Sequence, residues 1–316
     1  MDIVEHILCK DLNIDISKIK ISKFNVMEKH ILENYVEITR HFQEIDQLFE
    51  IFQFNLENLL TFYQLDSSDS IIRNFKFKFK SNDNIIINSF IISYISAGKP
   101  LTSSIEAFAK IHLGETSDDF KNFKENCLSK IYDENFHYRL LIRLRDFAQH
   151  GHLPVTTIDS NNRCCFNLQH ILYTPHYHHN KQLEEQIEKL IEDIRKQFAD
   201  YPHIAFTLSI VEFNICIIKI YLNFLDTITP LLINSRKQID SLLEKRPDII
   251  HKPHDAFNGF VFYDFIDNSF QCFNPQQDPI KMLFGKKGEL ENLLKQEETN
   301  FEKLANSPNQ KYINFE

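Results

Sequence analysis

The sequence predicts a mainly α-helical fold, a helical bundle with small β-hairpin additions. Over long stretches, apolar residues recur at spacings of three and four, which is typical of helices that bury one face. The 316 residues include only 6 Gly and 10 Pro, few for a loop-rich β sandwich. Hydrophobic residues make up 43% of the chain and charged residues 25%, a balance that favours a sizeable core over global disorder.

Composition and motifs exclude several classes of function. The net charge of −9 argues against a broad nucleic-acid-binding surface, so any contact with RNA must be local. No GxGxxG or GxxxxGK[ST] string supports a dinucleotide-binding fold or a P-loop. The six cysteines form no CxxC or Cys/His zinc pattern, so we expect free thiols, no metal and no cofactor. The charged N-terminal residues lack a signal-peptide core, which predicts a cytoplasmic protein.

In the N-terminal third of the chain, the spacing of apolar residues changes once, from the helical period to the alternation of a strand. Residues 26–63 have the helical pattern and predict one long helix or two in line, with a buried face that includes Ile31, Tyr35, Ile38, Phe42, Ile45, Phe49, Phe52, Leu56 and Leu59. Phe75, Phe77 and Phe79 then alternate with lysines, which predicts a half-buried strand. Its lysine face either contacts phosphates or protects the strand from edge pairing, and the second interpretation is favoured.

The rest of the chain reads as helices with two hairpins. A helix is expected from residue 83, where Gly98-Lys99-Pro100 either breaks or kinks it before Gly114 closes the run. Hairpins are expected near 154–173 and 259–273. Further helices are expected around Phe120–Cys127 and over residues 182–201, 203–229 and 288–305. The apolar stretch 203–229 contains three charged residues, which favours a buried helix between Pro202 and Pro230 over a membrane span.

The candidate functional residues gather at the end of a helix expected over residues 134–151, in the string "RLRDFAQHGHLP". On a helical wheel its apolar residues share one arc that faces the core. The opposite arc, expected to face solvent, carries Arg139, Arg143, Asp146 and His150, with Arg145 on its flank beside Gln149. A solvated amphipathic face accounts for this pattern. The use of arginine without lysine, ending in histidine, also suits phosphate recognition and proton transfer.

Arg145 to His150 reads Arg-Asp-Phe-Ala-Gln-His and matches the R-x4–6-H motif of HEPN (higher eukaryotes and prokaryotes nucleotide-binding) domains. The segment "YDENFHYRLLIRLRDFAQHGHLPV" also resembles a bacterial subgroup with an "LRNxxQHxxLP"-like helix end. The resemblance is clear over about 25 residues and extends over residues 83–155. It implies a bundle that dimerises so that two such helices meet. Many members are metal-independent ribonucleases in toxin–antitoxin, abortive-infection or CRISPR-linked defence.

The resemblance also implies roles for individual residues. Arg145 would bind the scissile phosphate, His150 would be the general acid/base, and Asp146 would orient one of them. Further substrate contacts would come from Arg139, Arg143, Gln149 and His152, although His152 is favoured as a mere helix end. On one helix, Arg145 and His150 lie about 140° apart, so we expect a homodimer to complete the site.

The predicted organisation has three parts. Residues 1–24 form a lead-in, residues 25–235 a HEPN-like helical region, and residues 236–316 a C-terminal extension with a terminal helix. The expected partners are RNA, a second copy of the chain and an antitoxin or sensor, with no membrane. The alternative is a catalytically silent HEPN-like module that binds RNA, a nucleotide or a partner protein.

Overall fold

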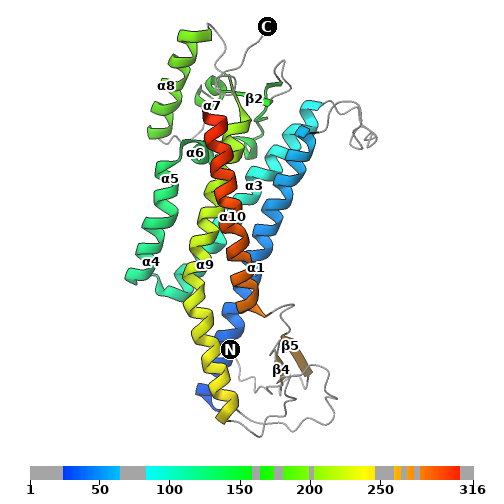
Figure 1. Ribbon diagram of the computed structural model, residues 1–316, viewed down its shortest axis with the longest axis vertical. Helices are drawn as coiled ribbons and strands as arrows, with labels where there is room; N and C mark the ends of the chain where they lie inside the picture. Colours follow the sequence, from blue (N-terminus) through cyan, green and yellow to red (C-terminus); the bar gives the residue numbers. More distant parts are fainter. Residues whose placement is uncertain are drawn as a thin grey trace. The chain divides into compact units, whose positions relative to one another are not determined.

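The structure is a computed structural model that describes residues 24–64, 83–158, 164–173, 181–198, 203–245, 260–264, 269–273 and 278–306. The described chain is mainly α-helical, as predicted (Figure 1). Three parts of the sequence lie outside the described residues: the lead-in before residue 24, the predicted Phe/Lys strand at 75–79 and the histidine-rich string "HYHH" at 176–179.

The helices are, in chain order, α1 Val26–Gln64, α3 Asp83–Ala109, α4 Asp118–Phe123, α5 Lys130–Glu134, α6 Phe136–Gln149, α7 Leu168–Tyr173, α8 Lys181–Phe198, α9 Phe206–Lys245 and α10 Pro279–Ala305. Two π-helical segments are η2 Lys110–Gly114 and η3 Lys124–Ser129. The strands are β1 Thr157–Ile158, β2 Cys164–Asn167, β3 His203–Ala205, β4 Phe260–Asp264 and β5 Ser269–Phe273.

The chain divides into two compact units, each built from segments far apart in sequence. Unit 1 comprises Met1–Glu44 and Leu222–Leu290, and unit 2 comprises Ile45–Tyr221 and Glu291–Glu316. Helices α1, α9 and α10 therefore contribute residues to both units.

The core of unit 2 is rich in aromatic rings. Tyr221 of α9 stacks on Phe49 of α1 with ring centroids 4.2 Å apart, and its hydroxyl donates to the buried Asp46 carboxylate at 2.6 Å. Gly98 of α3 packs closely against Phe213 of α9, because a Cβ atom at position 98 would lie 2.8 Å from Phe213 Cζ. The glycine therefore allows α3 and α9 to approach each other in this core.

Two prolines lie inside helices, where the sequence predicted either a break or a kink at Gly98-Lys99-Pro100 and a helix end at Pro230. Pro100 is within α3, which runs on without a break, and Thr102 donates to the Lys99 carbonyl. Pro230 was expected to stop the apolar helix, and this prediction is wrong because α9 continues to Lys245. Helices continue through proline when packing offsets the lost hydrogen bond, and Leu232 and Ile239 beyond Pro230 are fully buried.

The predicted hairpin at 154–173 is part of a three-stranded antiparallel sheet of order β1-β2-β3. In β2, Cys165 pairs with Thr157 of β1 on one side and with Ala205 of β3 on the other. The prediction is wrong for residues 168–173, which form α7, and for residues 203–205, which were expected to begin a helix. The predicted hairpin near 259–273 is confirmed by the β4–β5 pairing.

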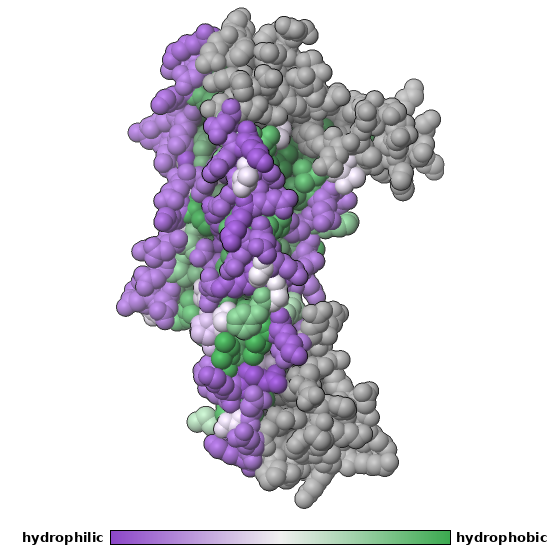
Figure 2. Space-filling view, viewed as in Figure 1, coloured by the Kyte–Doolittle hydropathy of each residue, from purple (hydrophilic) through white to green (hydrophobic). Residues whose placement is uncertain are grey.

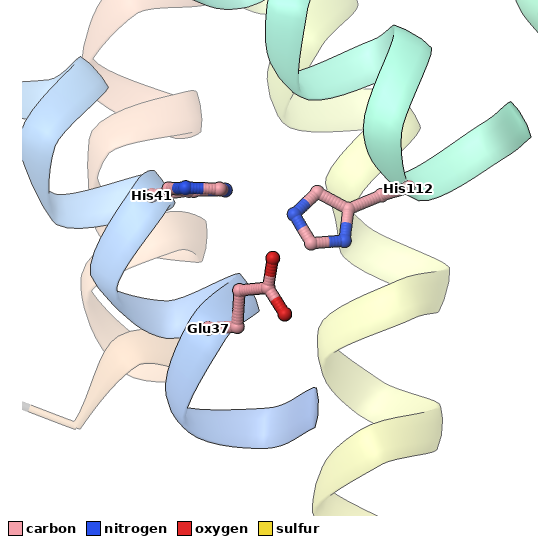
Figure 3. Close-up of side chains that lie close together, drawn as sticks. All are labelled: Glu37, His41 and His112. Atoms are coloured by element: carbon pink, nitrogen blue, oxygen red, sulfur yellow. The ribbon is translucent and has the colours of Figure 1, made fainter. Parts of the chain in front are cut away.

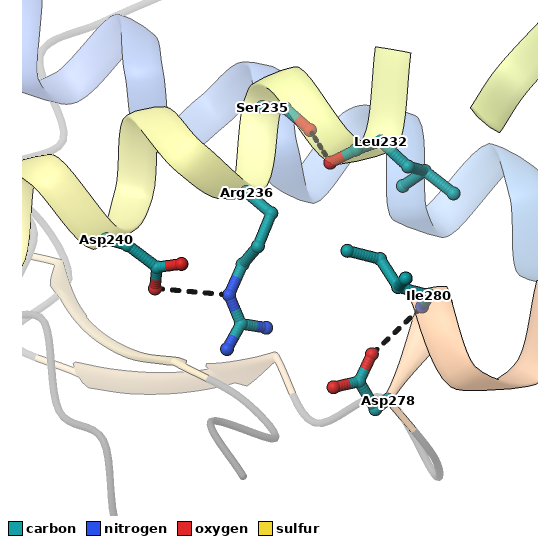
Figure 4. A network of polar contacts seen from close by, with 6 residues as sticks. All are labelled: Leu232, Ser235, Arg236, Asp240, Asp278 and Ile280. Carbon is teal, nitrogen blue, oxygen red and sulfur yellow. Dashed lines mark hydrogen bonds and ion pairs between the residues drawn. The ribbon is translucent and has the colours of Figure 1, made fainter. Parts of the chain in front are cut away.

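In unit 1, capping residues set the beginnings of two helices. Asn25 and Glu28 form a reciprocal capping box at α1: Asn25 N donates to Glu28 Oε2 at 2.9 Å and Glu28 N to Asn25 Oδ1 at 3.0 Å. Asp278 accepts from the Ile280 amide at 2.9 Å and caps α10, which begins at Pro279, nine residues earlier than expected (Figure 4). In the same view, the Arg236 guanidinium binds Asp240 one turn along α9.

Helix α8 is amphipathic, as its sequence predicts. It buries Leu183, Ile187, Ile191 and Ile194, and its visible surface is almost entirely hydrophilic (Figure 2). Two described stretches, Ile85–Gly114 and Phe206–Leu242, pass a length and composition test for membrane spans. In Phe206–Leu242, 72% of the most apolar window is buried inside the protein, which is typical of a core helix.

Candidate functional site at the end of helix α6

Helix α6, which carries the R-x4–6-H motif, has a clear beginning and a buried apolar face. Asn135 has extended backbone angles between α5 and α6, and its side-chain amide donates to the Ile131 carbonyl at 2.7 Å. The buried face includes Leu140, Leu141 and Leu144, each with no exposed surface. The structure therefore confirms the apolar face that the sequence predicted for this helix.

Gly151 ends α6 in a Schellman motif. Its φ of 90° is the left-handed conformation that glycine adopts without strain. The Gly151 amide donates to the Ala148 carbonyl at 3.0 Å, and the His152 amide donates to the Phe147 carbonyl at 3.3 Å. The His152 ring stacks on the Phe147 ring with centroids 4.6 Å apart, the side-chain contact that accompanies this motif. His152 therefore contributes to the helix end, the interpretation favoured from sequence.

The loop after the motif is anchored by Asn88, which sequence reasoning missed. Asn88 of α3 is 2% exposed, and its side chain exchanges two hydrogen bonds with the Val155 backbone. Asn88 Nδ2 donates to the Val155 carbonyl at 3.1 Å, and the Val155 amide donates to Asn88 Oδ1 at 2.8 Å. This pair of bonds holds the segment after His150 against α3. No sequence signal identifies Asn88, because the partners are 67 positions apart.

At the end of α6 the structure pairs Arg145 with Asp146. Arg145 Nη1 donates to Asp146 Oδ1 at 2.9 Å, and the side chains are 19% and 45% exposed. Within the described part of the chain, Arg145 Nε and Nη2 have no hydrogen-bond partner, and Nε is shielded from solvent. An unpaired buried donor costs about 1–3 kcal/mol. The Nε/Nη2 edge is thus suited to an acceptor that the described residues do not supply.

His150 and Gln149 are exposed at the last turn of α6, and Arg143 is half-buried. His150 occupies the C-cap, with its amide donating to the Asp146 carbonyl at 3.1 Å. His170 of α7 contributes a second exposed imidazole, whose ring lies edge-on to Phe147 at 5.6 Å. Sequence reasoning missed it, because it follows the motif by twenty residues.

Arg139 does not face solvent, contrary to the helical-wheel prediction. It is 1% exposed. Its guanidinium donates to the carbonyls of Tyr132 and Asp133 near the end of α5, and to Gln186 Oε1 of α8 at 2.6 Å. The prediction failed because α5 and α8 supply acceptors to the polar side of α6. A buried guanidinium with these partners links three helices and is not accessible to a substrate phosphate.

A second polar group of α6 is also turned inward. His137 Nδ1 and Ser209 Oγ share a hydrogen bond of 2.9 Å, and the His137 amide donates to Glu212 Oε2 at 2.9 Å. Burial lowers the pKa of His137 from 6.5 to about 4. Burial also raises the pKa of Glu212, against the opposing effects of the His137 amide and the Arg139 charge. At neutral pH the imidazole of His137 is therefore uncharged.

This lowered pKa predicts a loss of stability in mild acid. The unfolded chain binds a proton at His137 near pH 6.5, whereas the folded chain binds it near pH 4. Stability from the neutral ring is thus complete above pH 6.5 and is lost as the pH falls towards 4, by about 2–3 kcal/mol. Urea unfolding at both ends of this range measures the loss. His137→Gln should flatten that part of the profile, and an unchanged profile would contradict the assignment.

Two buried cysteines of unit 2 are unsuited to act as nucleophiles. Cys127, Cys165 and Cys216 are free and buried. Burial raises the pKa of Cys127 to about 12, and it raises the pKa of Cys216 further. Because the thiolate is the nucleophilic form, the thiols of Cys127 and Cys216 stay protonated and unreactive at neutral pH.

Histidines outside the motif occur in both units. In unit 1, Glu37 and His41 project from successive turns of α1 (Figure 3). In unit 2, the ring of His112 lies 4.3 Å from that of Phe108.

Comparisons of the chain with models of protein families, with characterised proteins and with solved structures gave no match.

Proposed function

We propose that the chain is a metal-independent endoribonuclease of the HEPN type, acting as a toxin or antiphage effector. The observation that carries the proposal is the end of α6, where an arginine with an unoccupied Nε/Nη2 edge precedes an exposed histidine by five residues. The assignment to a HEPN-like bundle rests on the motif and on the mainly helical fold.

The residues present can supply the required chemistry. The ribose 2′-oxygen attacks phosphorus and the bond from phosphorus to the 5′-oxygen breaks, leaving a 2′,3′-cyclic phosphate and a 5′-hydroxyl. His150 either takes the proton from the 2′-hydroxyl or gives one to the leaving 5′-oxygen, and a water molecule carries out the other proton transfer. Arg145 donates to the phosphate oxygens as their charge develops. Asp146 holds the guanidinium through the bond to Nη1.

We further propose that two copies of α6 form one cleft. Arg145 and His150 lie about 140° apart around their helix, so one helix does not direct both at the same phosphate. A twofold axis through paired α6 helices brings Arg145 of one chain towards His150 of the other. Arg143, Gln149 and His152 stay in the proposed RNA contact surface, and Arg139 does not, because it is buried.

The proposal predicts RNA cleavage that does not need a metal. Purified protein is expected to cut single-stranded RNA in the presence of EDTA and to leave 2′,3′-cyclic phosphate ends, because proton transfer and charge stabilisation both come from side chains. Product ends are read by phosphatase sensitivity and mass spectrometry. Loss of cutting in EDTA contradicts the metal-free mechanism. RNA binding without cutting at any condition supports the catalytically silent module instead.

A further inference from the structure

A cavity of about 320 Å³ lies in unit 2, away from the end of α6. Its walls come from α3, η3, α5 and the first turn of α6, and they include Lys99, Lys124, Tyr132, Asp133 and Tyr138. The volume is at the small end of the range for ligand pockets, roughly 300–1,000 Å³. The π-helical turns of η3 supply Lys124 to the wall, and such turns are frequent at functional sites.

Tyr138 contributes a ring and a hydroxyl to the cavity wall. It is 5% exposed, and its ring stacks on Phe213 with centroids 5.3 Å apart. Throughout the described ranges, no side chain or backbone group pairs with the Tyr138 hydroxyl, and the residue lines the cavity. The hydroxyl is therefore available to donate to, or accept from, a molecule bound there.

The charged side chains around the cavity indicate which charges a ligand should carry. Lys124 is engaged by Glu106 at 2.8 Å, so these two side chains neutralise each other. The ammonium of Lys99 and the carboxylate of Asp133 remain, and neither has an ion-pair partner within the described part of the chain. One unpaired positive and one unpaired negative group fit a ligand with both charges. A balanced lining of this kind does not favour a polyanion such as a nucleoside triphosphate.

Two aromatic side chains supply the apolar part of the wall. The Tyr132 and Tyr138 rings meet edge to face with centroids 6.3 Å apart, and Leu128 lies on the same wall. Arg139 fixes the backbone of this wall, because its guanidinium donates to the carbonyls of Tyr132 and Asp133. The site is thus preorganised, which reduces the entropic cost of binding.

We propose that this cavity binds a free apolar L-amino acid. Its carboxylate binds Lys99, its ammonium group binds Asp133, and the Tyr138 hydroxyl adds one hydrogen bond. The side chain of the ligand packs against Tyr132 and Leu128. The proposal is independent of RNA cleavage, because it uses none of the residues at the end of α6.

The test is binding of each of the twenty L-amino acids alone, by thermal shift and then by calorimetry at millimolar concentration. At least one apolar amino acid is expected to raise the melting temperature. Its N-acetyl derivative and its decarboxylated amine, each with one charge fewer, should bind about tenfold more weakly. No shift with any amino acid overturns the proposal, as does preferential binding of ATP or inorganic phosphate.

Two variants locate the site. Tyr138→Phe removes only the hydroxyl, and Lys99→Gln changes an exposed side chain, so both are expected to fold and to weaken binding about tenfold. Lys110→Gln is the matched control, because Lys110 is an exposed lysine paired with Glu115 outside the cavity, and it should bind normally. Unchanged binding by both Tyr138→Phe and Lys99→Gln overturns the proposal. Binding that persists in His150→Ala separates this site from the proposed nuclease.

Discussion

Replacing His150 by alanine is expected to slow RNA cleavage by about 10²–10⁴-fold, the usual contribution of a positioned acid or base. His150 is exposed at the C-cap of α6, so the free energy of unfolding should change by less than about 0.5 kcal/mol. Initial rates of cleavage of a labelled RNA in EDTA measure the first effect, and urea unfolding measures the second. Full activity of the variant removes the histidine from the mechanism.

Arg145→Ala should slow RNA cleavage by a comparable factor, and Arg145→Lys should restore little of the lost rate. A lysine keeps the charge but cannot offer the two parallel donors of a guanidinium edge to a phosphate. The matched controls are His30→Ala on α1 and Arg195→Ala on α8, both exposed residues outside α6, which should cut RNA at the normal rate. Equal losses in the control variants would show a nonspecific effect of charge.

Mixing the two inactive variants tests the shared cleft. If Arg145 of one chain works with His150 of the other, heterodimers of Arg145→Ala and His150→Ala contain one complete site and one doubly defective site. Co-expression with two different tags, followed by tandem purification, should recover about half of the normal activity. An active species that is monomeric by light scattering rules the shared cleft out.

Arg139→Leu is expected to lower the free energy of unfolding by about 3–5 kcal/mol, the usual effect of removing one partner from a buried charged network. The variant leaves the Tyr132 and Asp133 carbonyls without this donor and frees Gln186 Oε1. It also removes the positive charge that opposes the rise in the pKa of Glu212. Urea unfolding monitored by circular dichroism measures the change.

The control for Arg139 is Arg195→Leu, because Arg195 is exposed on α8 and should change stability by less than about 0.5 kcal/mol. Gln186→Ala should cost about 1 kcal/mol, since it removes one of the three acceptors. An Arg139→Leu variant as stable as the unchanged protein would show that the buried guanidinium contributes no net stability.

Arg139 also shows where sequence reasoning on this fold reached its limit. Helical periodicity placed it correctly opposite the leucines of α6, yet the position is buried. A wheel separates the faces of a helix but does not reveal which other segments cover a polar face. Here α5 supplies carbonyls and α8 supplies Gln186, 47 positions away. The buried arginine was therefore mistaken for a member of the exposed surface.

Pro230 and residues 203–205 illustrate a similar limit. A proline and its neighbours carry a local signal for the end of a helix. That signal is overridden in α9 by buried side chains on both sides of Pro230. The strand at 203–205 forms because β2 offers a pairing edge, and an isolated three-residue segment has no pattern that indicates this.

The sequence by itself determined the helical class, the helical pattern of α1, the amphipathic α6 and its end at Gly151, because spacing and glycine conformation are local properties of the chain. Only the tertiary structure decided that Arg139 is internal, that Asn88 anchors the loop after His150, and that Tyr138 lines a cavity. Each of these depends on a contact between segments that lie apart along the chain. Such contacts are selected by packing and by the need to pair buried polar groups, and neither leaves a periodic signal in the sequence.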